Sequence, residues 1–228
     1  MKRRHTLLCC LFLIVCNGTA AQQNDPGGGA EVRPDPLPLR TTLVYECNGY
    51  GFIARRGASE MALWLKDGYV VLPQAAEDSG TVYEDGDVSF WTSGDEAMLT
   101  VDGQNYQNCH LNPVRVPWED ARLRGVSFRA VGNEPGWYLE IQESRLLFVG
   151  QYATTRIMVP DAIAEGTSQV RAYRGTAGAQ QLRVDIVDEA CVDNMSGESF
   201  PSRVTVTLDG TSFQGCGQAL DSPSEDVD

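Results

Sequence analysis

The side chains that could do chemistry in this 228-residue chain are a few carboxylates, one serine and a set of cysteines. In the C-terminal half, Glu134, Asp193 and Ser196 are candidate polar groups, because two carboxylates could act as a general acid and a general base. Residues 125–220 contain no histidine, and neither a metal-binding cluster nor a nucleophile elbow accompanies these groups. We therefore predict that the chain is not an enzyme and uses neither a cofactor nor a metal.

A binding role and a structural role both stay open for these residues. Together with Trp137, they form the candidate site of a second domain. In the structural interpretation, Pro135-Gly136 is a turn that delivers Trp137 to a hydrophobic core. Asp193 and Ser196 would then only order the loop that follows Cys191.

The N-terminus predicts the compartment, and the compartment decides how the cysteines are interpreted. A basic patch at residues 2–4 precedes an apolar run at residues 7–15 and a stretch of small residues, the pattern of a secretory signal peptide. The apolar run is far shorter than the roughly 20 residues that span a bilayer, and no later segment predicts a membrane span. We predict cleavage of residues 1–21 and export to the periplasm. Lipidation at Cys16 is the alternative, although Val15 stands where lipoproteins carry a smaller residue.

Without the signal peptide, four cysteines remain, Cys47, Cys109, Cys191 and Cys216. Disulfides are the default in an oxidising compartment, and four cysteines allow three pairings. The long gap between the first two and the last two favours Cys47 with Cys109 and Cys191 with Cys216. Zinc is a poor competitor, because the remaining chain has no Cys-x-x-Cys pair and a single histidine, His110.

The chain is acidic, with a net charge of −13. Loss of residues 1–21 removes three basic residues and no acidic one, which takes the net charge to −16. Such a surface repels phosphate backbones and anionic membranes, so we predict no nucleic-acid partner. A cationic protein would be attracted, and the alternative is that the charge only keeps an exported protein soluble.

The elements that must position the candidate residues are short strands. Residues 22–40 contain three consecutive glycines followed by three prolines, which predicts a flexible spacer. From residue 41 to residue 111, eight short segments rich in β-branched and aromatic residues alternate with turn signals. Asp-Gly pairs stand at three of the joints, 67–68, 85–86 and 102–103. This pattern predicts a small antiparallel barrel whose first and last strands a Cys47–Cys109 disulfide would join.

The candidate binding loop of this barrel runs from Glu77 to Gly94. It pairs a turn at Ser79-Gly80 with a second turn at Thr92-Ser93-Gly94, and a strand is predicted between them at residues 88–92. Turns joined by short strands can meet at one rim of a barrel. The sequence therefore predicts a binding rim at this place.

The rest of the chain is also predicted to be all-β. Residues 112–124 form a predicted linker with one helical turn after Pro117. Residues 125–220 contain seven predicted strands and form a second antiparallel β domain. Residues 221–228 are acidic and are predicted to be a disordered tail.

One pattern of residues runs through the predicted barrel. Its members are Tyr45-x-Cys47, Ser79-Gly80-x-x-Tyr83, Phe90-Trp91, Gly94-Asp95-Glu96-Ala97, Leu99, Gly103 and Tyr106-x-x-Cys109. In order, spacing and cysteines, the pattern resembles the family of membrane-bound or periplasmic inhibitors of c-type lysozyme (MliC/PliC). The resemblance covers less than a third of the chain. It implies an eight-stranded barrel in the bacterial envelope that plugs the active-site cleft of a c-type lysozyme.

The resemblance also implies which residues carry the inhibition. A c-type lysozyme is a cationic protein whose cleft holds one protonated and one ionised carboxyl group. In the family, a serine hydroxyl and a lysine ammonium bind these groups. The serine corresponds to Ser79. The lysine corresponds to position 93, where this chain has Ser93 instead. Loss of such a charge-assisted hydrogen bond costs about 1.5–3 kcal/mol. The candidate inhibitor-loop residues are Ser79, Gly80, Tyr83, Ser93 and Gly94.

A second resemblance concerns the C-terminal half. Three segments, Phe128 to Trp137, Cys191 to Pro201 and Gly215-Cys216-Gly217, together resemble an uncharacterised domain of bacterial envelope lipoproteins. Two hypotheses therefore stand. The chain inhibits c-type lysozyme, or it is an envelope structural or ligand-binding protein that uses the barrel only as a scaffold.

Overall fold

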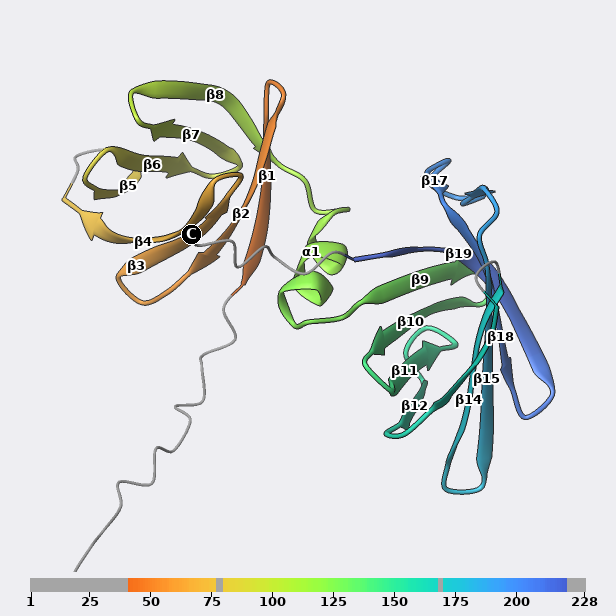
Figure 1. The fold of residues 1–228 in the computed structure, drawn as a ribbon. Coiled ribbons are helices and arrows are strands. Elements are labelled where there is room, and N and C mark those ends of the chain that lie inside the picture. The colour runs from red at the N-terminus through yellow and green to blue at the C-terminus, as the bar shows by residue number, and fades with distance from the viewer. Residues whose placement is uncertain (1–40, 77–79, 168–169, 221–228) are drawn as a thin grey trace, which may run out of the picture. The chain divides into compact units, whose positions relative to one another are not determined.

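The first β domain is a closed antiparallel barrel in this computed structural model, which describes residues 41–76, 80–167 and 170–220 (Figure 1). Its strands are β1 (Thr42–Cys47), β2 (Tyr50–Arg56), β3 (Glu60–Leu65), β4 (Gly68–Ala75), β5 (Thr81–Asp85), β6 (Val88–Ser93), β7 (Glu96–Val101) and β8 (Gln104–Leu111). They pair in chain order, and β1 closes the barrel by pairing with β8. The predicted eight-stranded barrel is confirmed. The predicted signal peptide, spacer and acidic tail, and also Ser79, lie outside the described residues.

Side chains that alternate inward along the strands fill the barrel. Tyr45, Phe52 and Phe90 form its aromatic centre, with ring centroids 5.3 to 5.6 Å apart. Cys47 and Cys109 form the predicted disulfide beside this core. Because β1 and β8 are paired over a short stretch, the disulfide reinforces the place where the barrel closes.

The second β domain is a nine-stranded antiparallel sheet with the order β12-β11-β10-β9-β19-β18-β15-β14-β13. Its strands are β9 (Phe128–Asn133), β10 (Gly136–Gln142), β11 (Arg145–Gly150), β12 (Thr155–Val159), β13 (Ile163–Gly166), β14 (Val170–Ala177), β15 (Gln180–Val187), β18 (Ser202–Leu208) and β19 (Thr211–Ala219). Two short strands, β16 (Cys191–Val192) and β17 (Ser199–Phe200), form a separate pair. The all-β prediction is confirmed, and β13, β16, β17 and β19 are strands that the sequence did not predict.

One face of the nine-stranded sheet carries the hydrophobic core. In β15, Leu182, Val184 and Ile186 are buried, while Arg183 between them is exposed. Aromatic side chains fill the centre of this core, and the ring of Phe148 lies 5.2 Å from that of Phe213. The predicted disulfide between Cys191 and Cys216 belongs to a smaller cluster of buried side chains.

A helix, α1 (Val116–Leu123), stands between the two sets of strands in the sequence. It is longer than the single predicted turn, and Pro117 lies in its first turn as expected. Its buried residues are Trp118 and Ala121, and the Trp118 ring stacks on Phe200 at 5.1 Å. Among the described residues, no helix has the length and apolar character needed to cross a membrane.

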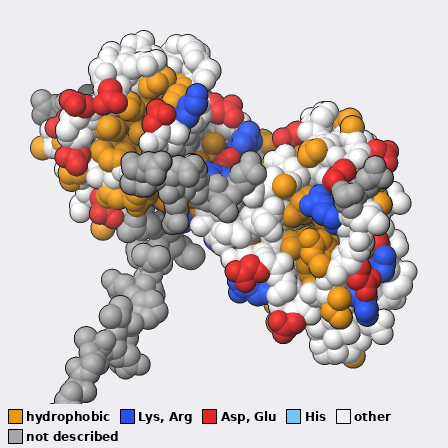
Figure 2. All heavy atoms as spheres, viewed as in Figure 1, with side chains coloured by type: hydrophobic (Ala, Val, Ile, Leu, Met, Phe, Trp, Pro, Cys, Tyr) orange, Lys and Arg blue, Asp and Glu red, His pale blue; other side chains and the backbone are white. Residues whose placement is uncertain are grey.

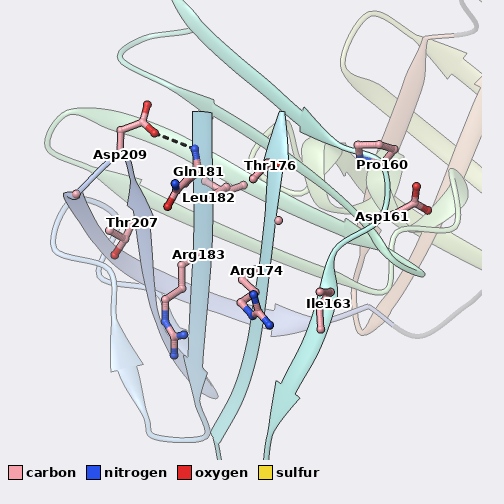
Figure 3. Close-up of a pocket in the computed structure, with 12 residues that line it drawn as sticks. Pro160, Asp161, Ile163, Arg174, Thr176, Gln181, Leu182, Arg183, Thr207 and Asp209 are labelled. Atoms are coloured by element: carbon pink, nitrogen blue, oxygen red, sulfur yellow. Dashed lines mark hydrogen bonds between the residues drawn. The ribbon is translucent and has the colours of Figure 1, made fainter. Parts of the chain in front are cut away.

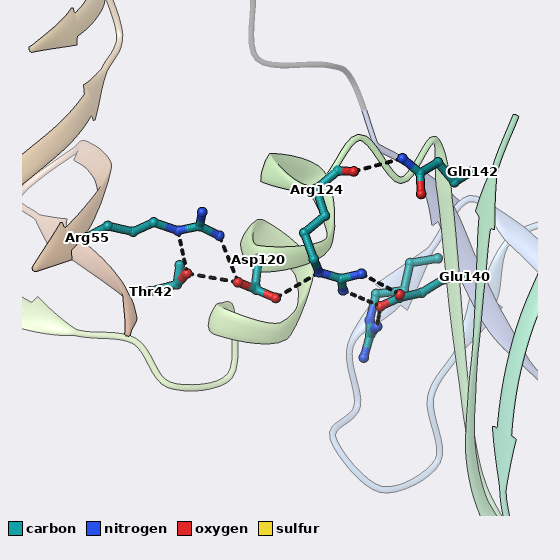
Figure 4. Close-up of polar contacts among 7 residues, drawn as sticks. Thr42, Arg55, Asp120, Arg124, Glu140 and Gln142 are labelled. Carbon is teal, nitrogen blue, oxygen red and sulfur yellow. Dashed lines mark hydrogen bonds and ion pairs between the residues drawn. The ribbon is translucent and has the colours of Figure 1, made fainter. Parts of the chain in front are cut away.

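Asp120 of α1 is the centre of a set of polar contacts (Figure 4). Its Oδ1 accepts hydrogen bonds from the Thr42 hydroxyl and from Arg55, both at 2.9 Å, and its Oδ2 accepts one from Arg124 at 3.0 Å. Burial alone would raise the pKa of Asp120, but the bonds from Arg124 and Thr42 and the nearby positive charges outweigh it. The pKa of Asp120 is therefore lowered. Arg124 in turn donates two bonds of 2.9 Å to Glu140.

Candidate functional site

The two turns of the candidate binding loop lie side by side at one rim of the barrel. Thr81, the first residue of β5, pairs with Thr92 near the end of β6. Gly80 directly precedes Thr81, and Ser93 directly follows Thr92. The register therefore places the Gly80 and Ser93-Gly94 turns next to each other at the end of the β5–β6 ribbon.

Two features of position 80 require glycine: its positive φ angle and the lack of space for a Cβ atom. Gly80 has a φ of +75°, in the region that favours glycine. A Cβ atom at this position would lie 2.5 Å from Nε1 of Trp91 and 3.2 Å from the carbonyl oxygen of Thr92. The edge of the Trp91 indole thus packs directly against the turn. A rigid aromatic ring supports the rim at this point.

The rim is also tied to the barrel core through Thr92. The Thr92 side chain is 5% exposed, and its hydroxyl forms a hydrogen bond of 3.3 Å with the hydroxyl of Tyr45. It also donates to the carbonyl oxygen of Glu96, which closes the β6–β7 turn. Burial raises the pKa of Tyr45 above its ordinary value, although the bond to Thr92 acts in the opposite direction. Tyr45 is therefore a neutral hydrogen-bonding support beneath the rim.

Charged side chains of both signs stand at the same rim. Asp95 in the β6–β7 turn and Glu96 at the start of β7 are exposed, and Figure 2 shows acidic side chains spread over the visible face of this domain. Arg56 is the last residue of β2, and it lies at this rim because every even-numbered strand of the barrel ends here. Its side chain is exposed. The charges of Arg56 and Asp95 act in opposite directions on the pKa of Tyr45, which places both near its hydroxyl. Within the described ranges, Arg56 makes no ion pair.

The structure sorts the predicted inhibitor-loop residues into three groups. Gly80, Ser93 and Gly94 are exposed at the rim. Tyr83 is 4% exposed and packs against Phe90, with ring centroids 6.4 Å apart, so its ring belongs to the core. Ser79 precedes Gly80 directly but lies outside the described residues, and its role stays a prediction.

In the second β domain, Asp193 and Ser196 come together in one loop. The Asp193 carboxylate accepts hydrogen bonds from the backbone N–H groups of Met195 and Ser196, from the Ser196 hydroxyl and from the Asn133 amide. Burial opposes ionisation, but these bonds outweigh it and lower the pKa of Asp193. The contacts hold the loop in place and occupy the carboxylate, which supports the structural interpretation of Asp193.

Trp137 and Glu134 lie in different surroundings from that loop. The turn between β9 and β10 consists of Glu134 and Pro135, one residue earlier than the predicted Pro135-Gly136 turn. Glu134 is exposed, while Trp137 is buried in the core. A Cβ atom added at Gly132 would lie 2.2 Å from Nε1 of the Trp137 indole, and one added at Gly215 would lie 2.7 Å from its Cζ2. The indole therefore occupies the space that side chains at these two positions would need. The described part of the chain holds no group of three His, Cys, Asp or Glu residues suited to a metal ion.

A groove of about 810 Å³, lined by both polar and apolar residues, lies on the second β domain (Figure 3). Arg174 of β14 and Arg183 of β15 face each other across the strands within it. Arg174 is paired with Glu165, and Arg183 donates to Asp185 at 2.6 Å. Carboxylates therefore already neutralise both arginines. The volume of the groove suits a small ligand, but its basic groups are not free to bind one.

The sequence predicted core or rim packing for Trp91, but not the contacts through which Trp91 and Thr92 support the rim, and it missed the charge of Arg56. Trp91 and Thr92 were assigned to a strand, but their contacts with Gly80 and Tyr45 depend on the register. Arg56 could have been found by counting strands, since every even-numbered strand of such a barrel ends at the same rim.

The comparisons with known proteins agree with this geometry for one part of the chain. Residues 45–108 match the family model described as membrane-bound lysozyme-inhibitor of c-type lysozyme. No curated protein and no solved structure gave a significant match. The second β domain receives no family from these comparisons, so its resemblance to an envelope lipoprotein domain stays a prediction. Residues 45–108 thus form a domain of the MliC lysozyme-inhibitor family.

Proposed function

We propose that this chain is an exported bacterial envelope protein that inhibits c-type lysozyme by covering the active-site cleft with the rim around Gly80 and Ser93. One observation carries the proposal. The register places the two turns side by side at one end of a closed barrel, where Trp91 and Thr92 support them. The described residues of this rim are held by these contacts, which lowers the conformational entropy that they lose on binding.

The charges of the two proteins favour their association. The cleft of a c-type lysozyme holds two carboxyl groups, of which one is ionised. A cation and a hydroxyl at the rim would pair with these groups, and the acidic surface around them would attract a cationic enzyme over a longer distance. The net charge of −13 supports the second of these effects.

Arg56 is the residue that we propose as the cation of the rim. Ser93 stands where the resemblance implies a lysine, so the β6–β7 turn itself brings no positive charge. Arg56 is exposed at the same end of the barrel and has no ion pair among the described residues. An arginine can bind a carboxylate through two parallel hydrogen bonds, which a lysine cannot do.

The proposal predicts stoichiometric inhibition of a c-type lysozyme by the mature chain. Turnover of cell walls by the enzyme is titrated with the wild-type chain and with Ser79→Ala and Arg56→Gln, at low salt. We expect each substitution to weaken inhibition by about tenfold or more, since each removes a hydrogen bond to a charged group. Ser212→Ala, at an exposed position of β19, serves as the control and should inhibit like the wild type. No inhibition by the wild-type chain would contradict the proposal.

Ser93→Lys is predicted to strengthen inhibition. The substitution adds a cation beside Gly80, and a charge-assisted hydrogen bond to a cleft carboxylate would tighten binding by about 10- to 100-fold. Ser212→Lys adds the same charge away from the rim and should leave the inhibition constant close to the wild-type value. Equal inhibition constants for Ser93→Lys and Ser212→Lys would show that position 93 does not face the cleft.

The second candidate function is that of an envelope structural or ligand-binding protein with the barrel as a scaffold. The groove of about 810 Å³ on the second β domain favours it. Under this alternative, the Ser79, Arg56 and Ser93 substitutions would have no effect on lysozyme.

A further inference from the structure

The ion pairs of the chain single out four basic residues. Of the 13 Lys and Arg residues that the structure describes, nine form an ion pair with a carboxylate. The four that form no ion pair with another described residue are Arg56, Lys66, Arg145 and Arg156. Two of the four, Arg145 and Arg156, line the same hollow of about 150 Å³.

The sheet register sets the positions of these two arginines. Leu147 of β11 pairs with Met158 of the antiparallel strand β12. Arg145 precedes Leu147 by two residues, and Arg156 precedes Met158 by two, so all four side chains share one face of the sheet. Because the strands run in opposite directions, the arginines lie on opposite sides of the Leu147–Met158 pair. Two guanidinium groups therefore flank a small apolar platform.

The platform is exposed, and its backbone is held by regular pairing on both strands. Met158 is 45% exposed, and Leu147 is half-buried. The next residues along β11, Leu146 and Phe148, point to the other face and are fully buried in the core. The core thus fixes the strands, while the long arginine side chains remain able to turn toward a ligand.

The carboxylate in the wall of the hollow does not neutralise these arginines. Glu140 lines the hollow, but it is already bonded by Arg124 and Arg129. Glu143, in the turn before Arg145, is exposed and forms no ion pair with it among the described residues. Arg145 and Arg156 therefore contribute two positive charges that no carboxylate of the described residues neutralises.

We propose that this hollow, although the chain as a whole is acidic, binds a phosphate group next to a short apolar substituent, either as a free phosphate compound or as the head group of an anionic lipid. Guanidinium groups bind phosphate oxygens through pairs of parallel hydrogen bonds. Leu147 and Met158 would contact the carbon atoms attached to the phosphate. A volume of about 150 Å³ equals roughly five water molecules of about 30 Å³ each, which suits a ligand of this size.

A competing explanation of the same residues is that β12 is the edge of the sheet. Charged side chains on an edge strand discourage pairing with other chains and need no ligand. This explanation predicts no saturable binding of phosphate, so binding experiments distinguish it from the proposal.

The test uses the mature chain and two double variants of equal net charge. Arg145→Gln/Arg156→Gln removes the proposed site, while Lys66→Gln/Arg203→Gln removes two exposed charges elsewhere. Inorganic phosphate and glycerol phosphate are titrated by calorimetry in a phosphate-free buffer. Flotation then compares vesicles of phosphatidylcholine with vesicles that also contain phosphatidylglycerol.

We expect the wild type and the Lys66/Arg203 variant to bind alike and the Arg145/Arg156 variant to bind at least about tenfold more weakly. Saturable binding of the small phosphates identifies a free ligand, and binding only to phosphatidylglycerol vesicles identifies a lipid head group. No binding by the wild type in either assay, or an equal loss in both double variants, would overturn the proposal. Because the substituted side chains are exposed, circular dichroism should give the same spectrum for all three proteins.

Discussion

Removing the Cys47–Cys109 disulfide is expected to lower the free energy of unfolding of the first β domain by about 4 kcal/mol. The two cysteines are separated by 62 residues, so the disulfide closes almost the whole barrel into one loop and restricts the unfolded chain accordingly. A barrel of this size has a small core, and a loss of this magnitude is a large part of its stability. The disulfide also joins β1 to β8, where the register is short.

The measurement is urea unfolding of Cys47→Ala/Cys109→Ala beside the oxidised wild type, followed by tryptophan fluorescence. Alanine is chosen because both cysteines are buried, and a serine would bury an unpaired hydroxyl. Cys191→Ala/Cys216→Ala is the matched variant, with a separation of 25 residues and an expected loss of about 3.5 kcal/mol in the second domain. An unchanged first-domain transition in the Cys47/Cys109 variant would contradict the prediction.

The barrel could be predicted from the sequence because its signals are local. Short β-branched segments, Asp-Gly turns and the spacing of four cysteines each limit the possible folds, and the observed strand order agrees with them. The site could be predicted only in part. Gly80 and Ser93 were named as turn residues, but the packing of Trp91 on Gly80 arises from the register. The cation at Arg56 comes from a different hairpin.

Strand β19 was not predicted, and its glycines explain why. Gly215 and Gly217 flank Cys216 in a segment that lacks the usual signal of a strand. A Cβ at Gly215 would lie 2.0 Å from the carbonyl oxygen of Val131, and one at Gly217 would lie 2.7 Å from that of Arg129. Glycine is present because β9 approaches β19 closely there, as glycine within a strand often indicates. Such closeness is a property of the assembled sheet.

The ion pair between Arg129 and Glu140 could not be predicted for a related reason. The two residues are direct neighbours across β9 and β10, in a register set by the Glu134-Pro135 turn. The predicted turn was one residue later, which shifts every pair along the hairpin. With the turn placed one residue too late, Arg129 and Glu140 are no longer paired across the two strands, so their ion pair cannot be predicted.

Glu140→Gln is expected to destabilise the second β domain by about 3–5 kcal/mol, because it leaves Arg129 buried without a compensating charge. The side chains of Glu140 and Arg129 are 5% and 8% exposed. The guanidinium of Arg129 lies over two aromatic rings, 4.6 Å from the ring centre of Tyr138 and 5.6 Å from that of Trp118. Burial lowers the pKa of Arg129, and the charge of Glu140 opposes that shift. The carboxylate is therefore what permits a charged arginine at this place.

Urea unfolding of the second-domain transition measures this effect, and two further variants test its cause. Glu189→Gln removes an exposed carboxylate paired with Arg203 and should cost less than about 1 kcal/mol. The double variant Glu140→Leu/Arg129→Met replaces both charges with apolar groups and should recover most of the loss, since a buried pair contributes little net stability once its desolvation is counted. A Glu140→Gln loss as small as that of Glu189→Gln would mean that water reaches Arg129. A double variant as unstable as Glu140→Gln would instead mean that the lost packing around Trp118 and Tyr138, and not the unpaired charge, causes the loss.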